Sequence, residues 1–193
     1  MIAHSTTRNG TIPVELDILP ADLLFCYSGG LLGKAIRWAE TGPGEERTYA
    51  NHIAGVNWAG MVVEALWTVK KTPWATWEAS HDKFELWRNT ELTEEDRFCI
   101  ADAADEYAGR KYGWWKLGIH LADALIFKVT GKDAYLFRRA LTGGRYPICY
   151  WIWTYPYAKK EITFGQKPNA VDPDEMHDYV RSVPTWTLIH KKG

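Results

Sequence analysis

The chain has 193 residues, and its 23 basic and 24 acidic side chains leave a net charge of -1 at pH 7. This balance gives no electrostatic reason to expect a nucleic-acid partner, because proteins that bind the negatively charged phosphates usually carry an excess of basic residues. A hydrophobic content of 46% is too high for a disordered chain and suits one folded domain over residues 1–193. The 11 tryptophans indicate a packed aromatic core or an amphipathic surface.

The spacing of the cysteines and the composition of the N-terminus limit which metal sites, disulfides and cellular compartments can be expected. Cys26, Cys99 and Cys149 share no Cys-x-x-Cys spacing, so neither a disulfide framework nor a metal site is predicted. No cofactor is expected. Residues 1–18 lack the continuous apolar segment of a signal peptide and are interpreted as an N-terminal extension. No apolar run reaches the roughly 18 residues of a membrane span. We therefore expect a cytoplasmic protein, while export by another route stays open.

The first third of the chain is rich in predicted strands. Residues 22–28 form a short apolar run that two glycines end, which indicates a buried strand. Residues 31–40 carry apolar side chains at helical spacing. Residues 52–58 and 61–67 are predicted to be two strands of a hairpin that turns around positions 59–60.

The remainder of the chain is predicted to be mainly helical. Thr93, followed by three carboxylates, starts a helix that Gly109 ends. The other expected elements are an amphipathic helix over 114–129, a helix over 149–155 ending near Pro156, a capped helix over 172–182 and a terminal strand over 185–190. This mixture of neighbouring strands and helices predicts an α+β fold.

Cys149 is the candidate nucleophile. It follows Pro147 and stands at the first turn of a predicted helix, where unpaired N–H groups and the helix dipole favour a thiolate. Nucleophilic chemistry also needs a base and a group that orients the base. The alternative is a buried, inert thiol, the usual state of a free cysteine, and Cys26 and Cys99 are interpreted in that way.

His52 and Glu64 are the candidate partners. His52 opens a strand, and small residues follow it. Glu64 stands among apolar residues, where a carboxylate is costly unless it is paired, although it could instead face solvent. A two-residue turn would direct Glu64 away from His52, whereas a three-residue loop would place it opposite Val56, on the His52 face. A triad with Cys149 therefore demands an odd-length loop.

Seven segments, in this order along the chain, carry a family resemblance. They are LPADLLFCYSGGLLGKAIRWAE, NHIAGV, VVEAL, FELWRNTELTEEDR, YAGRKYGWW, PICYWIW and NAVDPDEMHDYVRS, within residues 19–190. Together they resemble the permuted papain-like cysteine hydrolases, in the YiiX and YebB-like branch of the NlpC-type superfamily. That superfamily also contains the lecithin retinol acyltransferase-like proteins.

The resemblance implies a circularly permuted papain-like fold, in which an antiparallel sheet packs against helices. In that fold the strand histidine precedes the helix cysteine along the chain. Cys149 matches the nucleophile, His52 matches the base, and Glu64 matches the polar residue that orients the histidine.

The resemblance also implies residues that support the substrate or the oxyanion. Tyr112 matches a tyrosine beside the cysteine. Asp22 matches the acidic position of a Pro-Gly-Asp motif in which alanine replaces the glycine here. Relatives commonly continue Cys-Ser-Glu, whereas Tyr150 and Trp151 follow the cysteine in this chain. These two rings could wall a pocket for an acyl chain or an aromatic group.

The expected function is that of a thiol hydrolase, an amidase or peptidase, that cleaves an amide in a peptide, a cell-wall peptide or an N-acyl compound. Two alternatives remain open. One is an acyltransferase, or a lipid esterase or thioesterase, for which residues 114–129 could contact a membrane surface peripherally. The other is a non-catalytic binding module on the same scaffold.

Overall fold

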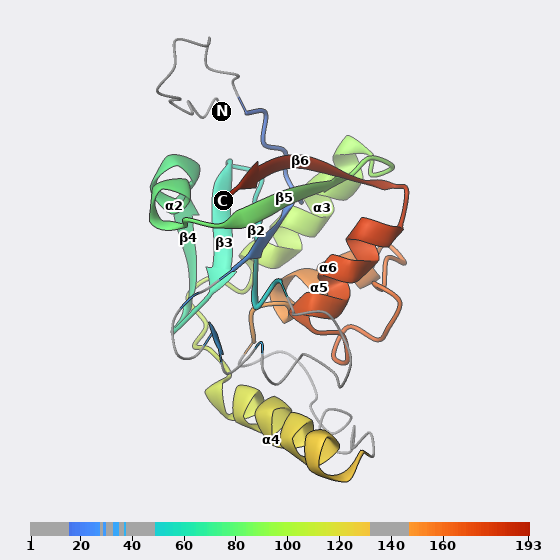
Figure 1. Ribbon diagram of the computed structural model, residues 1–193. Coiled ribbons are helices and arrows are strands. Elements are labelled where there is room, and N and C mark those ends of the chain that lie inside the picture. Colours follow the sequence, from blue (N-terminus) through green and yellow to red (C-terminus); the bar gives the residue numbers. More distant parts are fainter. Residues whose placement is uncertain (1–15, 28, 30–32, 35–36, 38–48, 132–146) are drawn as a thin grey trace.

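The computed structural model describes residues 16–27, 29, 33–34, 37, 49–131 and 147–193, with only part of the side chains of α4. This part is α+β, as predicted, and is built around a six-stranded antiparallel sheet of order β4-β3-β2-β1-β5-β6 (Figure 1). The strands are β1 Leu23–Cys26, β2 His52–Val56, β3 Met61–Ala65, β4 Val69–Pro73, β5 Phe84–Asn89 and β6 Trp186–Lys192.

Helices cover the sheet and its edges. They are α2 Trp74–Ser80, α3 Glu94–Asp105, α4 Trp114–Thr130, α5 Trp151–Ala158 and α6 Pro173–Ser182. α3 packs with α5, α6 packs with β6, and α2 lies beside β3 and β4. α4 stands apart from the sheet at the bottom of Figure 1. Within the described residues, no helix is both long enough and apolar enough to cross a membrane.

Alternation along the strands creates two apolar clusters, one on each face of the sheet. Leu23 and Phe25 of β1 belong to the larger cluster, which includes the aromatic residues of α5. Leu24 and Cys26 belong to the smaller cluster, which includes Trp77 of α2. The two-residue period of a strand explains this division, because successive side chains point to opposite faces.

Trp153 positions α5 on the sheet. A Cβ atom at Gly55 of β2 would lie 2.6 Å from the Trp153 ring, so only glycine lets the indole approach this closely. The indole Nε1 donates to the Val63 carbonyl oxygen, at 3.4 Å. One helical turn further on, the Tyr157 hydroxyl donates to the Ala21 carbonyl oxygen. These contacts tie α5 to β2, to β3 and to the segment before β1.

Most of the predicted elements are confirmed. β1, the hairpin of β2 and β3, and β6 occupy the predicted segments, as do α4 and α6. The capped start of α6 is a capping box between Asp172 and Glu175. Thr93 caps α3 as predicted, but α3 ends at Asp105 and turns follow it up to Gly109. The predicted helix over 31–40 lies mostly outside the described residues.

The prediction for the helix around Cys149 was wrong at both ends. α5 begins at Trp151, after the N-cap residue Tyr150, and it continues through Pro156 to Ala158. A proline inside a helix removes one backbone hydrogen bond and crowds the preceding turn. Here the buried ring of Tyr157, anchored to the sheet, follows the proline and keeps the last turn in place.

Candidate active site

The hairpin loop has the odd length that the triad requires. The Asn57 N–H group donates to the Met61 carbonyl oxygen at 2.8 Å, which leaves residues 58–60 as a three-residue loop. The Asn57 side-chain oxygen accepts from the backbone N–H groups of Ala59 and Met61, at 3.0 and 2.9 Å. Gly60 adopts a φ of 70°, a backbone conformation that favours glycine. The conformation of the loop is thus fixed by hydrogen bonds to the Asn57 side chain and by the glycine at position 60.

The cross-strand neighbour of Glu64 differs from the expected one. Glu64 pairs with Ala54, and Val56 pairs with Val62. The expected neighbour, Val56, lies two positions further along β2, because a loop of residues 58–60 pairs 57 with 61 and therefore 54 with 64. A shift of two keeps a side chain on the same face, so Glu64 still lies on the face of His52.

His52 and Glu64 form a buried pair. The distance from His52 Nε2 to Glu64 Oε2 is 3.0 Å, and the side chains are 13% and 0% exposed. Burial alone would lower the pKa of His52, but hydrogen bonds with Cys149 and Glu64 raise it to about 10. Burial acts to raise the pKa of Glu64, yet the hydrogen bond and charge of His52 lower it to about 2. Both partners therefore carry charge at neutral pH.

Cys149 completes the chain of contacts. Its side chain is hydrogen bonded to His52. Because His52 Nε2 meets Glu64, Nδ1 is the ring nitrogen left for the sulfur. Cys149 is 7% exposed and lies in the turn before α5, where the Trp151 N–H group donates to the Ile148 carbonyl oxygen at 3.1 Å. It precedes the N-cap residue and so stands just outside the helix, not in its first turn as predicted.

Tyr112 is brought beside Cys149 by backbone contacts. Its N–H group donates to the Trp67 carbonyl oxygen at 3.0 Å, and the Gly113 N–H group donates to the Pro147 carbonyl oxygen at 2.9 Å. Tyr112 is hydrogen bonded to both the side chain and the backbone of Cys149. Burial, reinforced by the nearby Cys149, raises the pKa of Tyr112 well above its ordinary value. The phenol therefore keeps its proton at neutral pH.

Asp22 does not join this cluster. It precedes β1, whereas the opposite end of that strand, Cys26, pairs with His52. The Asp22 carboxylate accepts from Arg88 Nε and Nη2, at 2.9 and 2.7 Å, and lies 3.5 Å from Arg97 Nη1. Burial raises the pKa of Asp22 in spite of these contacts, while the pKa of Arg88 is raised through the same pair against the effect of burial. The structure assigns Asp22 to a buried ion-pair cluster.

The two aromatic residues after Cys149 are part of the core. Tyr150 and Trp151 are 3% and 1% exposed and pack in the larger apolar cluster. Their bulk is absorbed by the interior of the protein and does not form an open pocket wall. Of the other thiols, Cys26 is buried as expected, whereas Cys99 is exposed, contrary to its interpretation as a core residue.

A second histidine–carboxylate pair was not predicted. His177 Nε2 lies 2.8 Å from Glu85 Oε2, and both side chains are buried. Lys191 and Trp87 also donate to Glu85, at 2.7 and 3.0 Å. Burial lowers the pKa of His177, while these hydrogen bonds, acting against burial, lower the pKa of Glu85 to about 2. The helical spacing of Met176, His177 and Val180 in α6 could have indicated that His177 lies on the buried face of the helix.

Two further residues face the His52–Glu64 pair. Lys70 of β4 lies directly opposite Glu64 in the ladder, with its Nζ 3.3 Å from Glu64 Oε1. His81 is the residue that ends α2. It stacks on Trp77, and burial lowers its pKa, although it feels the charges of both Glu64 and His52. The sequence offered no signal for Lys70, because β4 was not predicted.

Comparisons with known proteins assign no family. Neither the scan against family models nor the search of curated proteins found a match. Among solved structures, one described as the crystal structure of metalloprotein yiiX from Escherichia coli O157:H7 is similar to this chain. The TM-score is 0.49 with 19% identity, over 91% of this chain and 98% of that one. Within the described part of the present chain, no three or more His, Cys, Asp or Glu side chains are grouped to hold a metal ion.

Proposed function

We propose that this chain is a thiol hydrolase on a circularly permuted papain-like scaffold, and that it cleaves an amide bond through an acyl-enzyme on Cys149. The observation that carries the proposal is the continuous contact from Cys149 through His52 to Glu64. The chain order, with a strand histidine before a cysteine that precedes a helix, supports the permuted scaffold.

The second histidine–carboxylate pair helps to identify the reactive one. His177 and Glu85 are as close as His52 and Glu64, but the contacts of that histidine are with aromatic rings, those of Phe25, Tyr49 and Trp87. A relay needs a nucleophile at one end. Of the two histidines, His52 is the one hydrogen bonded to a thiol, so we assign the chemistry to it.

The reaction follows from this arrangement. In the resting enzyme His52 already holds the proton that the Cys149 thiol has given up, in keeping with its raised pKa, and the thiolate attacks the carbonyl carbon of the substrate. The imidazolium then gives its proton to the leaving nitrogen as the C–N bond breaks, which leaves a thioester on Cys149. Water attacks this thioester while His52 accepts a proton from it; the C–S bond then breaks, the acid product leaves, and Cys149 is restored as a thiolate beside protonated His52.

Tyr112 and the backbone next to Cys149 are suited to support the oxyanion. The tetrahedral intermediate carries a negative oxygen close to the attacking sulfur. The Tyr112 hydroxyl, which already contacts Cys149, keeps its proton and can donate it in a hydrogen bond. A backbone N–H group beside Cys149 would be a second donor, but not that of Trp151, which already donates to the Ile148 carbonyl oxygen.

Glu64→Gln should lower the pKa of His52 and slow the chemistry. The amide keeps the shape and one acceptor of Glu64 but loses the negative charge that favours protonated His52. Burial then dominates, so the pKa of His52 should fall from about 10 toward its ordinary value. We expect hydrolysis of 4-nitrophenyl acetate to slow by roughly 10- to 1,000-fold, less than the ~10⁴-fold loss in a serine triad. NMR titration of the His52 ring measures the first effect directly.

The same variant should change how stability depends on pH. The pKa of His52 is raised in the folded protein, so its contribution is complete below about pH 6.5 and is lost as pH rises toward 10. The pKa of Glu64 is lowered, so its contribution is present above about pH 4.5 and is lost as pH falls toward 2. The difference in Tm between parent and variant should therefore be largest between about pH 4.5 and about pH 6.5, where both contributions are complete.

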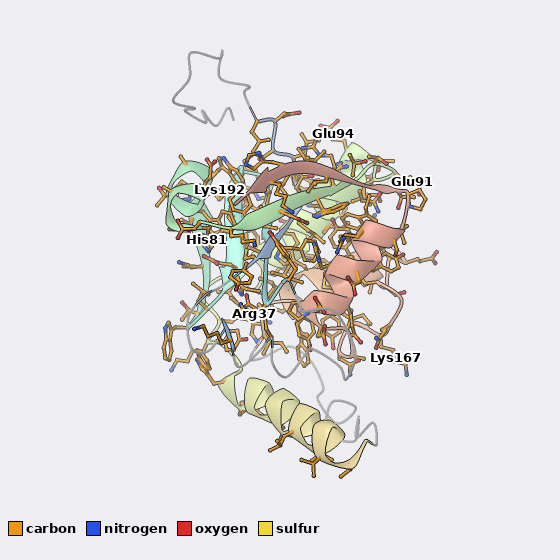
Figure 2. All side chains as sticks on the ribbon, viewed as in Figure 1. Arg37, His81, Glu91, Glu94, Lys167 and Lys192 are labelled. Atoms are coloured by element: carbon orange, nitrogen blue, oxygen red, sulfur yellow. The ribbon has the colours of Figure 1, made fainter. Side chains whose placement is uncertain are left out.

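Glu91→Gln is the matched control, because Glu91 is exposed and lies at the edge of the molecule in Figure 2. It should alter neither the titration nor the rate. A His52 titration that is the same in Glu64→Gln and in the parent would remove Glu64 from the relay.

A further inference from the structure

Each oxygen of the Glu64 carboxylate lies within ion-pair distance of a cationic side chain, although the contact at Oε1 lacks hydrogen-bond geometry. Oε2 lies 3.0 Å from His52 Nε2, and Oε1 lies 3.3 Å from Lys70 Nζ. The Glu64 side chain is fully buried, whereas that of Lys70 is 48% exposed. The ladder between β3 and β4 places Lys70 directly opposite Glu64, so the contact is built into the register of the sheet.

From this geometry, and resting on the proposed function, we infer that Lys70 is a positioning residue of the thiol relay. It holds Glu64 so that the carboxylate keeps its orientation toward His52. It also keeps a counter-charge beside Glu64 when His52 gives up its proton. Lys70 touches neither the thiol nor the substrate, and it acts through Glu64 alone.

The need for a second cation arises within the reaction. When the imidazolium passes its proton to the leaving nitrogen, His52 becomes neutral, and Glu64 loses the positive charge next to it. A buried carboxylate without a counter-charge is strongly disfavoured and would tend to pull the proton back. The ammonium of Lys70 takes no part in the proton transfer, so its charge stays beside Glu64 throughout the cycle.

The other titratable groups around Glu64 do not supply that charge. His81 feels the Glu64 charge, but burial lowers its pKa, which leaves the ring neutral at neutral pH. Cys26 of β1 also faces this region, and burial, together with the charge of Glu64, raises its pKa well above the ordinary value. Among the described groups that face Glu64, Lys70 is thus the cation that remains after His52 is deprotonated.

An ordinary ion pair offers the competing explanation. A partly exposed lysine beside a carboxylate contributes little to stability in many proteins. Such a role would leave the pH dependence of the chemistry unchanged when Lys70 is removed. A positioning role predicts a change in rate and in pH profile that disappears when Glu64 itself is neutral.

The test compares Lys70→Met with Lys70→Arg and with Lys71→Met. Lys71 is the adjacent lysine of β4; it faces the other side of the sheet and pairs with Asp105 at 3.4 Å, which makes it a matched control. In Lys70→Met we expect the kcat for 4-nitrophenyl acetate hydrolysis to fall roughly tenfold, while KM stays unchanged. The acid limb of Cys149 alkylation by iodoacetamide should move to higher pH. Lys70→Arg should restore both, and Lys71→Met should resemble the parent.

A double-mutant cycle with Glu64→Gln decides the outcome. If Lys70 acts through Glu64, Lys70→Met should have almost no further effect in the Glu64→Gln background. Equal effects in both backgrounds, or a Lys70→Met profile identical to that of Lys71→Met, would overturn the inference while leaving the thiol relay standing. If alkylation of Cys149 also ignores the loss of His52, the proposed function fails instead.

Discussion

Cys149→Ala is expected to abolish turnover while the fold stays intact. The variant removes the atom that forms the acyl-enzyme, and loss of a nucleophile in a comparable relay costs about 10³-fold or more. The side chain lies in a turn before α5, so a methyl group in its place leaves the backbone of the turn undisturbed. Hydrolysis of 4-nitrophenyl acetate measures the activity, and thermal unfolding followed by circular dichroism measures the fold.

The other two cysteines provide the controls. Cys99→Ala changes an exposed thiol and should leave both rate and Tm as in the parent. Cys26→Ala removes a buried sulfur and should lower the Tm through the cavity it leaves, with the chemistry preserved. Turnover by Cys149→Ala at the parental rate would mean that the observed hydrolysis does not pass through Cys149.

Asp22→Ala is expected to cause the largest loss of stability. The carboxylate is buried and bound by Arg88 and Arg97, so its removal leaves two cationic side chains without their counter-charge. Breaking a buried ion pair in this way costs about 3–5 kcal/mol. The change should appear as a lower midpoint in urea unfolding. Lys160→Ala, which breaks an ion pair on the surface of α3, should shift the midpoint only slightly.

Asp22→Asn separates stability from chemistry. The amide keeps the size of Asp22, and at a temperature where the variant is folded we expect its Cys149 to be alkylated at the parental rate. Slower alkylation of the folded variant would return Asp22 to the site, as the family resemblance first implied.

The contact between His52 and Glu64 could be anticipated because its signals are local. An isolated glutamate in an apolar strand needs a partner, and the length of one hairpin loop decides whether His52 supplies it. β1 and the hairpin could likewise be predicted, because their apolar runs are bounded by glycines or polar residues. In each case the deciding residues lie within a dozen positions of one another.

Other features depend on contacts that the sequence does not reveal. β5 escaped notice because buried polar residues interrupt its apolar pattern, and Glu85 is buried only because His177 and Lys191 reach it from distant segments. β4 is an edge strand with mostly exposed side chains, so it shows no apolar pattern at all. Lys70 could not be recognised as a partner of Glu64 without that strand and its register.

Asp22 shows the limit of reasoning from a resemblance. Its position in a short motif predicted a role near the substrate. Its carboxylate is instead bound by Arg88 and Arg97, which lie far along the chain. Tyr150 and Trp151 were likewise assigned to a pocket because aromatic residues can line one. Their true position followed from the start of α5 at Trp151, which turns both rings into the core.

The central claim is that His52 activates Cys149, and the rate of Cys149 alkylation by iodoacetamide as a function of pH tests it most directly. The measurement is made on Cys99→Ala protein, which lacks the exposed thiol, with and without His52→Ala. With His52 present, alkylation should stay rapid at about pH 5 to 6, where an ordinary thiol is almost wholly protonated. His52→Ala should abolish this reactivity at low pH. Identical profiles in the two proteins, each rising only near about pH 8.5, would contradict the account and favour a non-catalytic binding module.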